Sequence, residues 1–137
     1  MITRETQPFN PGSVAALVLP RRSFSYRLVT VFANVSTVVA VANRSMQLAV
    51  SDGAGNQIGI WSSSTPLAAS SGRLYTFAEG MTQVFNVVDL TETVAIPPDL
   101  WIQQNWTVTL SIQNFQAGDL MSIAVFQSEF YPTAHIR

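Results

Sequence analysis

Charged side chains are scarce in this sequence of 137 residues, of which only 11% are Asp, Glu, Lys or Arg. Soluble domains usually carry about 25%. Lysine is absent, the formal net charge is −1, and there is no basic run. These features exclude nucleic-acid binding through general neutralisation of phosphates. The polar residues are mostly uncharged Ser, Thr, Gln and Asn, which pack against other protein at little desolvation cost. The composition therefore favours a chain that functions in an assembly, although a lightly charged monomer is the alternative.

Cysteine is also absent, and His135 is the only histidine. The chain therefore lacks disulfides, thiol nucleophiles and cysteine-type zinc sites. His135 lies three residues from the end, in a segment that we expect to be extended, so it is a poor candidate for a catalytic triad. We predict no catalytic residue, no metal site and no cofactor.

Long apolar runs are missing as well. No stretch approaches the roughly 18 residues of a membrane helix. The first residues, which include acidic Glu5 and two prolines, are unlike a signal peptide. We therefore expect a protein that does not contact a membrane, and that either stays in the cytosol or leaves it by a route that the sequence does not encode.

What the sequence does contain is alternation of β-branched and aromatic residues with polar ones. In residues 106–112, Trp106, Val108, Leu110 and Ile112 point one way and the polar residues point the other. Similar strands are expected at 29–35, 45–51, 73–80, 82–90, 106–113 and 121–130. Residues 27–44 could form one apolar helix, but their β-branched residues disfavour it. The pattern predicts an all-β, single-domain antiparallel β-sandwich, with a jelly roll as the expected form.

Turn residues separate these strands and set the expected domain boundaries. Residues 51–57 and 116–119 predict hairpins, the second with Gly118 at positive φ. We assign residues 13–131 to the sandwich, residues 1–12 to an extended N-terminal arm, and residues 132–137 to a C-terminal tail.

Three sets of residues could carry chemistry. Asp52 and Asn56 share a loop but lack the acidic spacing of an EF-hand, so we interpret them as a turn. Three acidic residues, Asp89, Glu92 and Asp99, are close in sequence. A glycosidase needs two carboxylates that face each other across a cleft, whereas these flank a turn and a short strand. We expect them at solvated loop edges.

Trp101 and Trp106 form the third set. Trp106 begins the alternating run, so we predict that it packs in the core, whereas Trp101 follows two prolines and should cover one end of the sandwich or touch a neighbour. The alternative, an aromatic platform for sugar, would need both rings exposed in one plane.

The two ends of the chain supply the remaining candidate contacts. The N-terminal arm would dock on an adjacent subunit or on another protein of the assembly, with Phe9 as the anchor and Arg4 as a hydrogen-bonding fork. Phe130 and Tyr131 near the C-terminus would act similarly. Together with Trp101, these residues are the predicted assembly contacts.

Three motifs in the chain resemble those of small jelly-roll accessory proteins of tailed-phage particles, of the head decoration or cement type. They are "VANRSMQLAVSDGAGNQI", "IPPDLWIQQNWTVTLSI" and "FQAGDLMSIAVF". The "AGD" turn is also similar to that of trimeric jelly rolls of the C1q and tumour-necrosis-factor type.

The resemblance implies a non-enzymatic structural protein that is made in the host cytoplasm and located in the virion. Such a protein would stabilise the shell by binding the major capsid protein or another virion protein. We also expect the chain to associate with itself, as a trimer or another symmetric oligomer, because it carries few charges and its sheet edges lack the lysines that usually protect them. The alternative is a carbohydrate- or receptor-binding module of a phage tail or fibre, whose partner would be a glycan.

Overall fold

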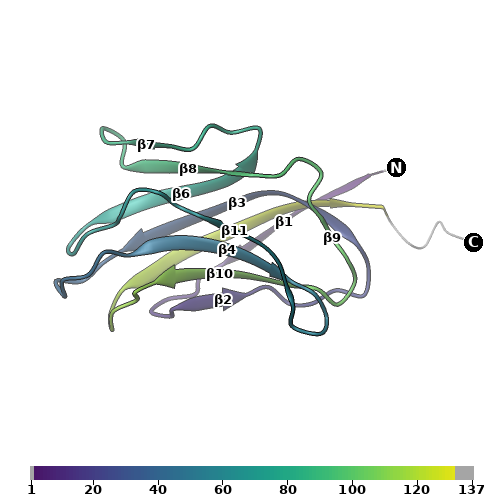
Figure 1. Cartoon of the computed structure of the whole chain (residues 1–137), viewed down its shortest axis with the longest axis horizontal. Helices are drawn as coiled ribbons and strands as arrows, with labels where there is room; N and C mark the ends of the chain where they lie inside the picture. The colour runs from purple at the N-terminus through teal and green to yellow at the C-terminus, as the bar shows by residue number, and fades with distance from the viewer. Residues whose placement is uncertain (1, 132–137) are drawn as a thin grey trace, which may run out of the picture.

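The structure of the protein is a computed structural model that describes residues 2–131, and these residues form two β-sheets packed face to face (Figure 1). Sheet A contains β1 (Thr3–Phe9), β3 (Tyr26–Ser36), β6 (Gly72–Glu79), β7 (Val84–Asn86), β8 (Thr91–Ile96), β9 (Trp101–Ile102) and β11 (Leu120–Phe130). Sheet B contains β2 (Ala16–Val18), β4 (Ser45–Ser51), β5 (Gln57–Ser62) and β10 (Thr107–Gln113). The predicted all-β, single-domain sandwich is confirmed.

The strand order is that of a jelly roll. Sheet A runs β1-β11-β3-β6-β8-β7, with β9 paired to β3, and sheet B runs β2-β10-β4-β5. Without β7, β8 and β9, the remaining eight strands form two four-stranded antiparallel sheets, with the chain crossing between them as in a double Greek key. The three additional strands lie between β6 and β10 in the sequence, and β8 pairs with β6 in parallel.

The core lies between the sheets because the predicted alternation places one apolar face of each strand inward. In β10, Val108, Leu110 and Ile112 are buried, and in β4 every second residue is buried. Tyr26, Tyr75, Phe77 and Phe126 supply large buried rings of sheet A. The strand expected at 82–90 is shorter than predicted, because only Val84–Asn86 pairs and the next four residues form a turn.

The N-terminal segment is placed differently from the arm that we expected outside the sandwich. It is extended, but Thr3–Phe9 forms β1, which pairs with β11 along its whole length. Its inward-facing side includes the polar residues Glu5 and Gln7. Glu5 forms an ion pair with Arg22 at 2.6 Å, and the Arg22 guanidinium lies over the ring of Tyr26 at 4.8 Å. Because these inward-facing residues are polar, the sequence of this strand does not alternate between apolar and polar residues.

The predicted hairpin at 51–57 is confirmed, since it joins β4 to β5 within sheet B. The turn at 116–119 is not a hairpin of one sheet, because it joins β10 of sheet B to β11 of sheet A. Gly118 has the expected positive φ, at 95°. A local sequence motif specifies the turn but does not specify which sheet the next strand joins.

Candidate functional site

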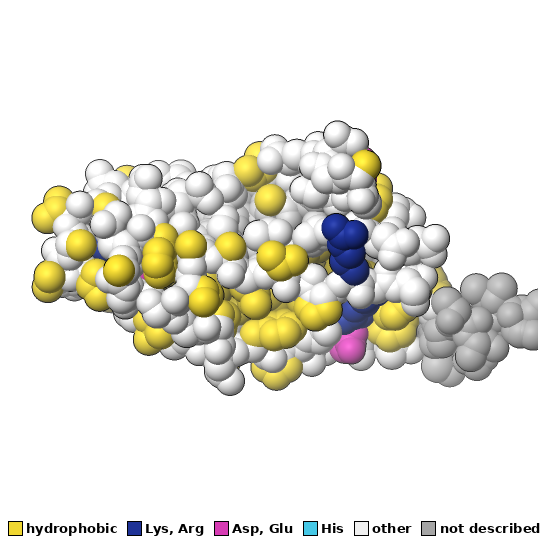
Figure 2. Space-filling view, turned by 90° about the horizontal axis from the view of Figure 1, so that it is seen from below, with side chains coloured by type: hydrophobic (Ala, Val, Ile, Leu, Met, Phe, Trp, Pro, Cys, Tyr) yellow, Lys and Arg dark blue, Asp and Glu magenta, His cyan; other side chains and the backbone are white. Residues whose placement is uncertain are grey.

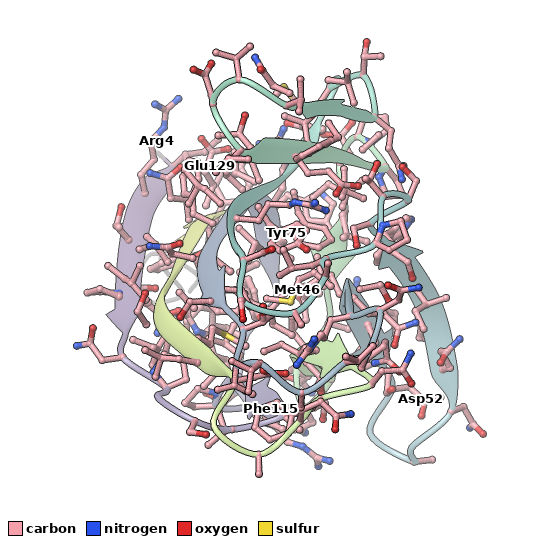
Figure 3. The ribbon with its side chains drawn as sticks, turned by 90° about the vertical axis from the view of Figure 1, so that its left-hand side faces the viewer. Arg4, Met46, Asp52, Tyr75, Phe115 and Glu129 are labelled. Atoms are coloured by element: carbon pink, nitrogen blue, oxygen red, sulfur yellow. The ribbon has the colours of Figure 1, made fainter. Side chains whose placement is uncertain are left out.

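Several predicted contact residues meet at the end of sheet A where the first strand begins and the last strand ends. Strand pairing places Arg4 beside Glu129, Glu129 beside Arg27, and Arg27 beside Trp101. Figure 3 shows Arg4 and Glu129 close together at the edge of the molecule. Residues far apart in the sequence thus form one surface, which contains a group of ions that we call the terminal cluster: Arg4, Arg27, Glu79, Asp99 and Glu129.

Arg27 is the centre of the terminal cluster. Its Nη1 donates to Glu129 Oε1 at 2.7 Å, its Nε lies 3.3 Å from Asp99 Oδ1, and its Nη2 contacts the Glu79 carboxylate. Arg4 Nε lies 2.8 Å from the second oxygen of Glu129. The side chain of Arg27 is only 19% exposed, whereas that of Arg4 is 85% exposed. The cluster therefore has a fixed inner arginine and an outer arginine whose remaining donors face solvent.

Two hollows open beside the terminal cluster. The larger, about 380 Å³, is lined by residues of β1, β3, β6 and β11, and the smaller, about 200 Å³, is lined by Ile2, Trp101, Phe130 and Tyr131 among others. Arg27 and Glu129 line both hollows. The surface thus offers charged hydrogen-bonding groups on one side and aromatic rings on the other.

The aromatic side of this surface contains three of the predicted contacts. The rings of Trp101 and Tyr131 are stacked, with centroids 6.4 Å apart and planes at 7° to each other. Phe130 is partly buried and packs against Phe24, with ring centroids 4.9 Å apart. Trp101 and Tyr131 therefore present a paired aromatic surface, whereas Phe130 mainly supports it from the core.

Trp106 is not part of this surface. It lies just before β10, is partly buried and packs against the core. A turn with Asn105 at φ 65° separates it from Trp101. The two tryptophans therefore do not form a joint aromatic platform for sugar.

Phe9 is the predicted contact that lies elsewhere. It stands at the far end of β1 from Arg4 and packs against the core, where its ring meets that of Phe126 edge to face at 5.8 Å. Its aromatic contact is thus made within its own chain.

The residues at the centre of the terminal cluster were not identified from the sequence. Arg27, Glu79 and Glu129 come from three strands, and neither their spacing nor their neighbours mark them as partners. The C-terminal tail 132–137, including His135, lies outside the described residues.

The acidic residues expected at solvated loop edges differ in their environments. Asp89 and Asp99 are exposed, but Glu92 is fully buried on β8. Glu92 accepts a hydrogen bond from Arg73 Nη1 at 3.0 Å and others from the backbone amides of Ser64 and Thr65. The expectation for Glu92 was wrong, because its neutralising partner comes from the neighbouring strand β6.

The turn after β4 is held by Asp52, whose Oδ1 accepts the backbone amides of Ala54 and Asn56 at 2.9 Å. The hydrogen bond from the Asn56 amide is the main cause of a lowered pKa of the Asp52 carboxyl. The lone pairs of the Asp52 carboxylate are thus used within the turn itself, as expected for a structural motif. Within residues 2–131, no group of three or more acidic, His or Cys side chains is arranged to hold a metal ion.

The opposite end of the sandwich is built from loops that expose several apolar side chains, with the exposed carboxylate of Asp89 among them. Val39 and Val41, between β3 and β4, are 81% and 95% exposed, and Val87 and Val88, between β7 and β8, are 71% and 85% exposed. The pairing of Ser36 with Gly72 and the hydrogen bond from Leu74 N to Leu90 O bring these loops to the same end of sheet A. We call Val39, Val41, Val87, Val88 and Leu90 the apolar end. Figure 2 shows one face of the molecule, on which apolar side chains lie among uncharged ones and charged groups are few.

No helix within residues 2–131 is both long enough and apolar enough to cross a membrane.

No protein-family model matches the sequence, and no curated protein matches it. Among solved structures, the chain is similar to part of dimeric latent PorU from Porphyromonas gingivalis, with a TM-score of 0.43, 12% identity, and coverage of 93% of this chain and 13% of that one. It is also similar to a chain of infectious bursal disease virus, Gx strain (TM-score 0.40, 13% identity, 98% and 33% covered). A chain of nora virus gives a TM-score of 0.28 at 13% identity, with 93% and 54% covered. The chain spans less than two thirds of each of these proteins.

Proposed function

We propose that this chain is a non-enzymatic structural protein of a virus particle, and specifically a decoration or cement protein on the capsid of a tailed phage. The observation that carries the proposal is the apolar end. Four valines exposed by 71–95% at one end of a jelly roll are a typical protein-binding surface. The low charge content of the chain reduces the desolvation cost of such docking.

In this proposal the apolar end docks on the major capsid protein or another shell protein. The opposite end, with the terminal cluster, faces away from the shell. The chain would act through buried area rather than through chemistry, and it would associate with itself into a symmetric oligomer. The trimer expected from the sequence stays a prediction.

Particle incorporation tests the docking. The double variant Val87→Asp/Val88→Asp places two charges on the apolar end without touching the core. We expect it to fold as the unchanged protein does, by circular dichroism, and to be missing from purified particles. Val18→Asp is the matched control, since Val18 is 55% exposed on β2, away from these loops. Normal incorporation of the double variant would reject the apolar end as the docking surface.

Copy number in the particle tests the specific role. A decoration protein would be present in hundreds of copies, whereas a tail, collar or fibre protein would be present in a few or a dozen. Quantitative mass spectrometry of fractionated particles measures this number. Absence of the chain from particles would reject the virion assignment altogether.

A second candidate function, binding of a glycan receptor, is favoured by the paired rings of Trp101 and Tyr131. Stacked aromatic rings beside Asp99 and Glu129 offer a sugar both an apolar face and hydrogen-bond acceptors. A glycan array tests it, with Trp101→Ala as the variant that should lose any signal. Binding that persists in this variant would place the glycan elsewhere.

A further inference from the structure

Among residues 2–131, the strands that end the two strand orders are β1, β7, β2 and β5, and the two-residue β9 adds a further edge. All of these edges except β5 are protected against pairing with another strand. β2 and β7 are only three residues long. β1 carries Arg4, Glu5 and Pro8, and both charge and proline oppose the addition of a further strand. β5 is six residues long, "QIGIWS", with neither a charge nor a proline. β5, at the edge of sheet B, therefore has none of the features that prevent pairing with another strand: it is not short, and it has no charge and no proline.

The backbone of β5 directs hydrogen-bonding groups to this open edge. Ser63 N donates to Met46 O at 2.9 Å, and β4 and β5 are paired antiparallel with Gln47 opposite Ser62. Because bonding alternates along an antiparallel pair, Trp61 and Gly59 use their backbone groups toward β4. Ile60 and Ser62 therefore point their N–H and C=O groups away from the sheet.

Among the residues that the structure describes, only part of this edge is occupied. The Ser62 carbonyl accepts a hydrogen bond from Gln83 Nε2 at 3.0 Å. A register shift between Val50 and Ser51 disturbs the other end of the strand, near Gln57. Ile60, between these two features, has a regular geometry and a 41% exposed side chain.

The side chains of β5 suit a second copy of the same strand. Ile58 and Ile60 are 49% and 41% exposed on one side of the strand. In an antiparallel pair related by a two-fold axis, Ile60 of one copy would face Ile60 of the other, with Ile58 on the diagonal. Because β5 carries no charge, this arrangement brings no like charges together across the axis.

We propose that this protein self-associates in solution through antiparallel pairing of β5 with β5 of a second copy. The two Ile60 residues exchange backbone hydrogen bonds, so that the two four-stranded sheets become one continuous eight-stranded sheet. The isoleucines of both copies then form a single apolar patch. This inference concerns the isolated chain and does not rest on the virus-particle assignment.

The size of the contact sets the expected strength. Stable specific interfaces bury about 1,200–2,000 Å² in total, and a short strand edge with two isoleucines from each copy supplies less than that. We therefore expect a weak dimer whose population rises with protein concentration.

Sedimentation equilibrium over a concentration series tests the proposal. The unchanged protein should pass from monomer to dimer. Ile60→Lys places two like charges opposite each other and should raise the dimer dissociation constant by about tenfold or more. Val18→Lys is the matched control, because it adds the same charge at an exposed valine on the other edge strand of sheet B. It should dimerise as the unchanged protein does.

Hydrogen exchange of the unchanged protein gives a second readout that needs no variant. The Ile60 amide should exchange rapidly in dilute solution and more slowly as the concentration rises. The Gly59 amide, which is directed to β4, should be protected at both concentrations. A protein that stays monomeric, an Ile60 amide whose exchange is independent of concentration, or a dimer that Ile60→Lys leaves intact would overturn the proposal. None of these results would test whether the apolar end docks on a virus particle.

Discussion

Arg44 and Asp119 form a two-point ion pair inside the sandwich. Arg44 Nε lies 2.9 Å from Asp119 Oδ2 and Nη2 lies 3.0 Å from Oδ1, with both side chains at most 1% exposed. The backbone amides of Val38 and Gln116 also donate to this carboxylate. The pair therefore joins the β3–β4 loop to the turn between β10 and β11. These residues belong to the "ANR" and "AGD" motifs, so two of the motifs that carry the resemblance meet in space.

Removal of one member of this pair should be costly. Asp119→Ala leaves the Arg44 guanidinium buried without its counter-charge, and we expect a loss of about 3–5 kcal/mol in the free energy of unfolding. Urea denaturation measures it. The double variant Arg44→Met/Asp119→Leu should lose less than Asp119→Ala, because no buried charge remains. Arg4→Gln, at an exposed ion pair, should change stability by no more than about 1 kcal/mol. Equal losses in all three proteins would contradict this account.

The same pair predicts a dependence of stability on pH. Burial alone would raise the pKa of the Asp119 carboxyl, but hydrogen bonds from Arg44 and from the amides of Gln116 and Val38 outweigh it, and the pKa lies below its ordinary value of 3.8. A lowered folded-state pKa stabilises the fold above the unfolded-state value, and this contribution is lost as pH falls through the folded-state pKa. The stability difference between the unchanged protein and Asp119→Asn should therefore be constant above about pH 5 and shrink as the pH falls below that value. A difference that stays constant would show that the group does not titrate as expected.

Trp106→Ala should destabilise the fold more than Trp101→Ala does. Trp106 is partly buried against the core, so we expect a cost of about 3 kcal/mol, the lower end for a truncated tryptophan. Trp101 pairs with Arg27 at a sheet end and stacks on Tyr131, and its loss should cost less in the isolated chain. Chemical denaturation of both variants measures the order, and the reverse order would mean that the turn at Asn105 is misplaced.

Deletion of residues 2–9 should prevent normal folding. On the sequence alone, removal of an external arm would leave the fold intact. In the structure the deletion would uncover the backbone of β11 and the ring of Phe126. We expect loss of cooperative thermal unfolding or aggregation, detected by calorimetry and light scattering. Phe9→Ala is the milder form and should cost at least about 2 kcal/mol. A truncated chain with an unchanged melting temperature would restore the arm interpretation.

How much the sequence predicts depends on where each strand buries its side chains. β4, β10 and the apolar part of β11 face a core, so alternation reveals them. β1 faces inward with the polar residues Glu5 and Gln7, and Arg22, the partner of Glu5, comes from elsewhere in the fold. The alternation of β1 is therefore invisible in a hydropathy pattern. Local signals predict apolar burial, but they do not reveal polar burial that depends on a distant partner.

The candidate surface shows the same limit. Trp101 and Tyr131 were identified because large aromatic rings near prolines and chain ends are conspicuous in a sequence. Arg27 and Glu79 were not identified, because an ion pair between two strands leaves no pattern in the sequence when its two residues are 52 positions apart. Glu92 was assigned to solvent for a related reason, since its partner Arg73 belongs to a parallel neighbour.

The strand order also has a consequence for synthesis of the protein. β10 and β11, which leave the ribosome after the other strands described here, are inner strands of their sheets: β10 lies between β2 and β4, and β11 lies between β1 and β3. Until they emerge, β1 and β2 lack the strands with which they pair in the finished fold. Neither sheet can therefore close until β10 and β11 have been synthesised, and such non-local pairing is slow. A product that terminates before β10 would expose open strand edges in both sheets and would be prone to aggregation rather than remaining a smaller folded protein.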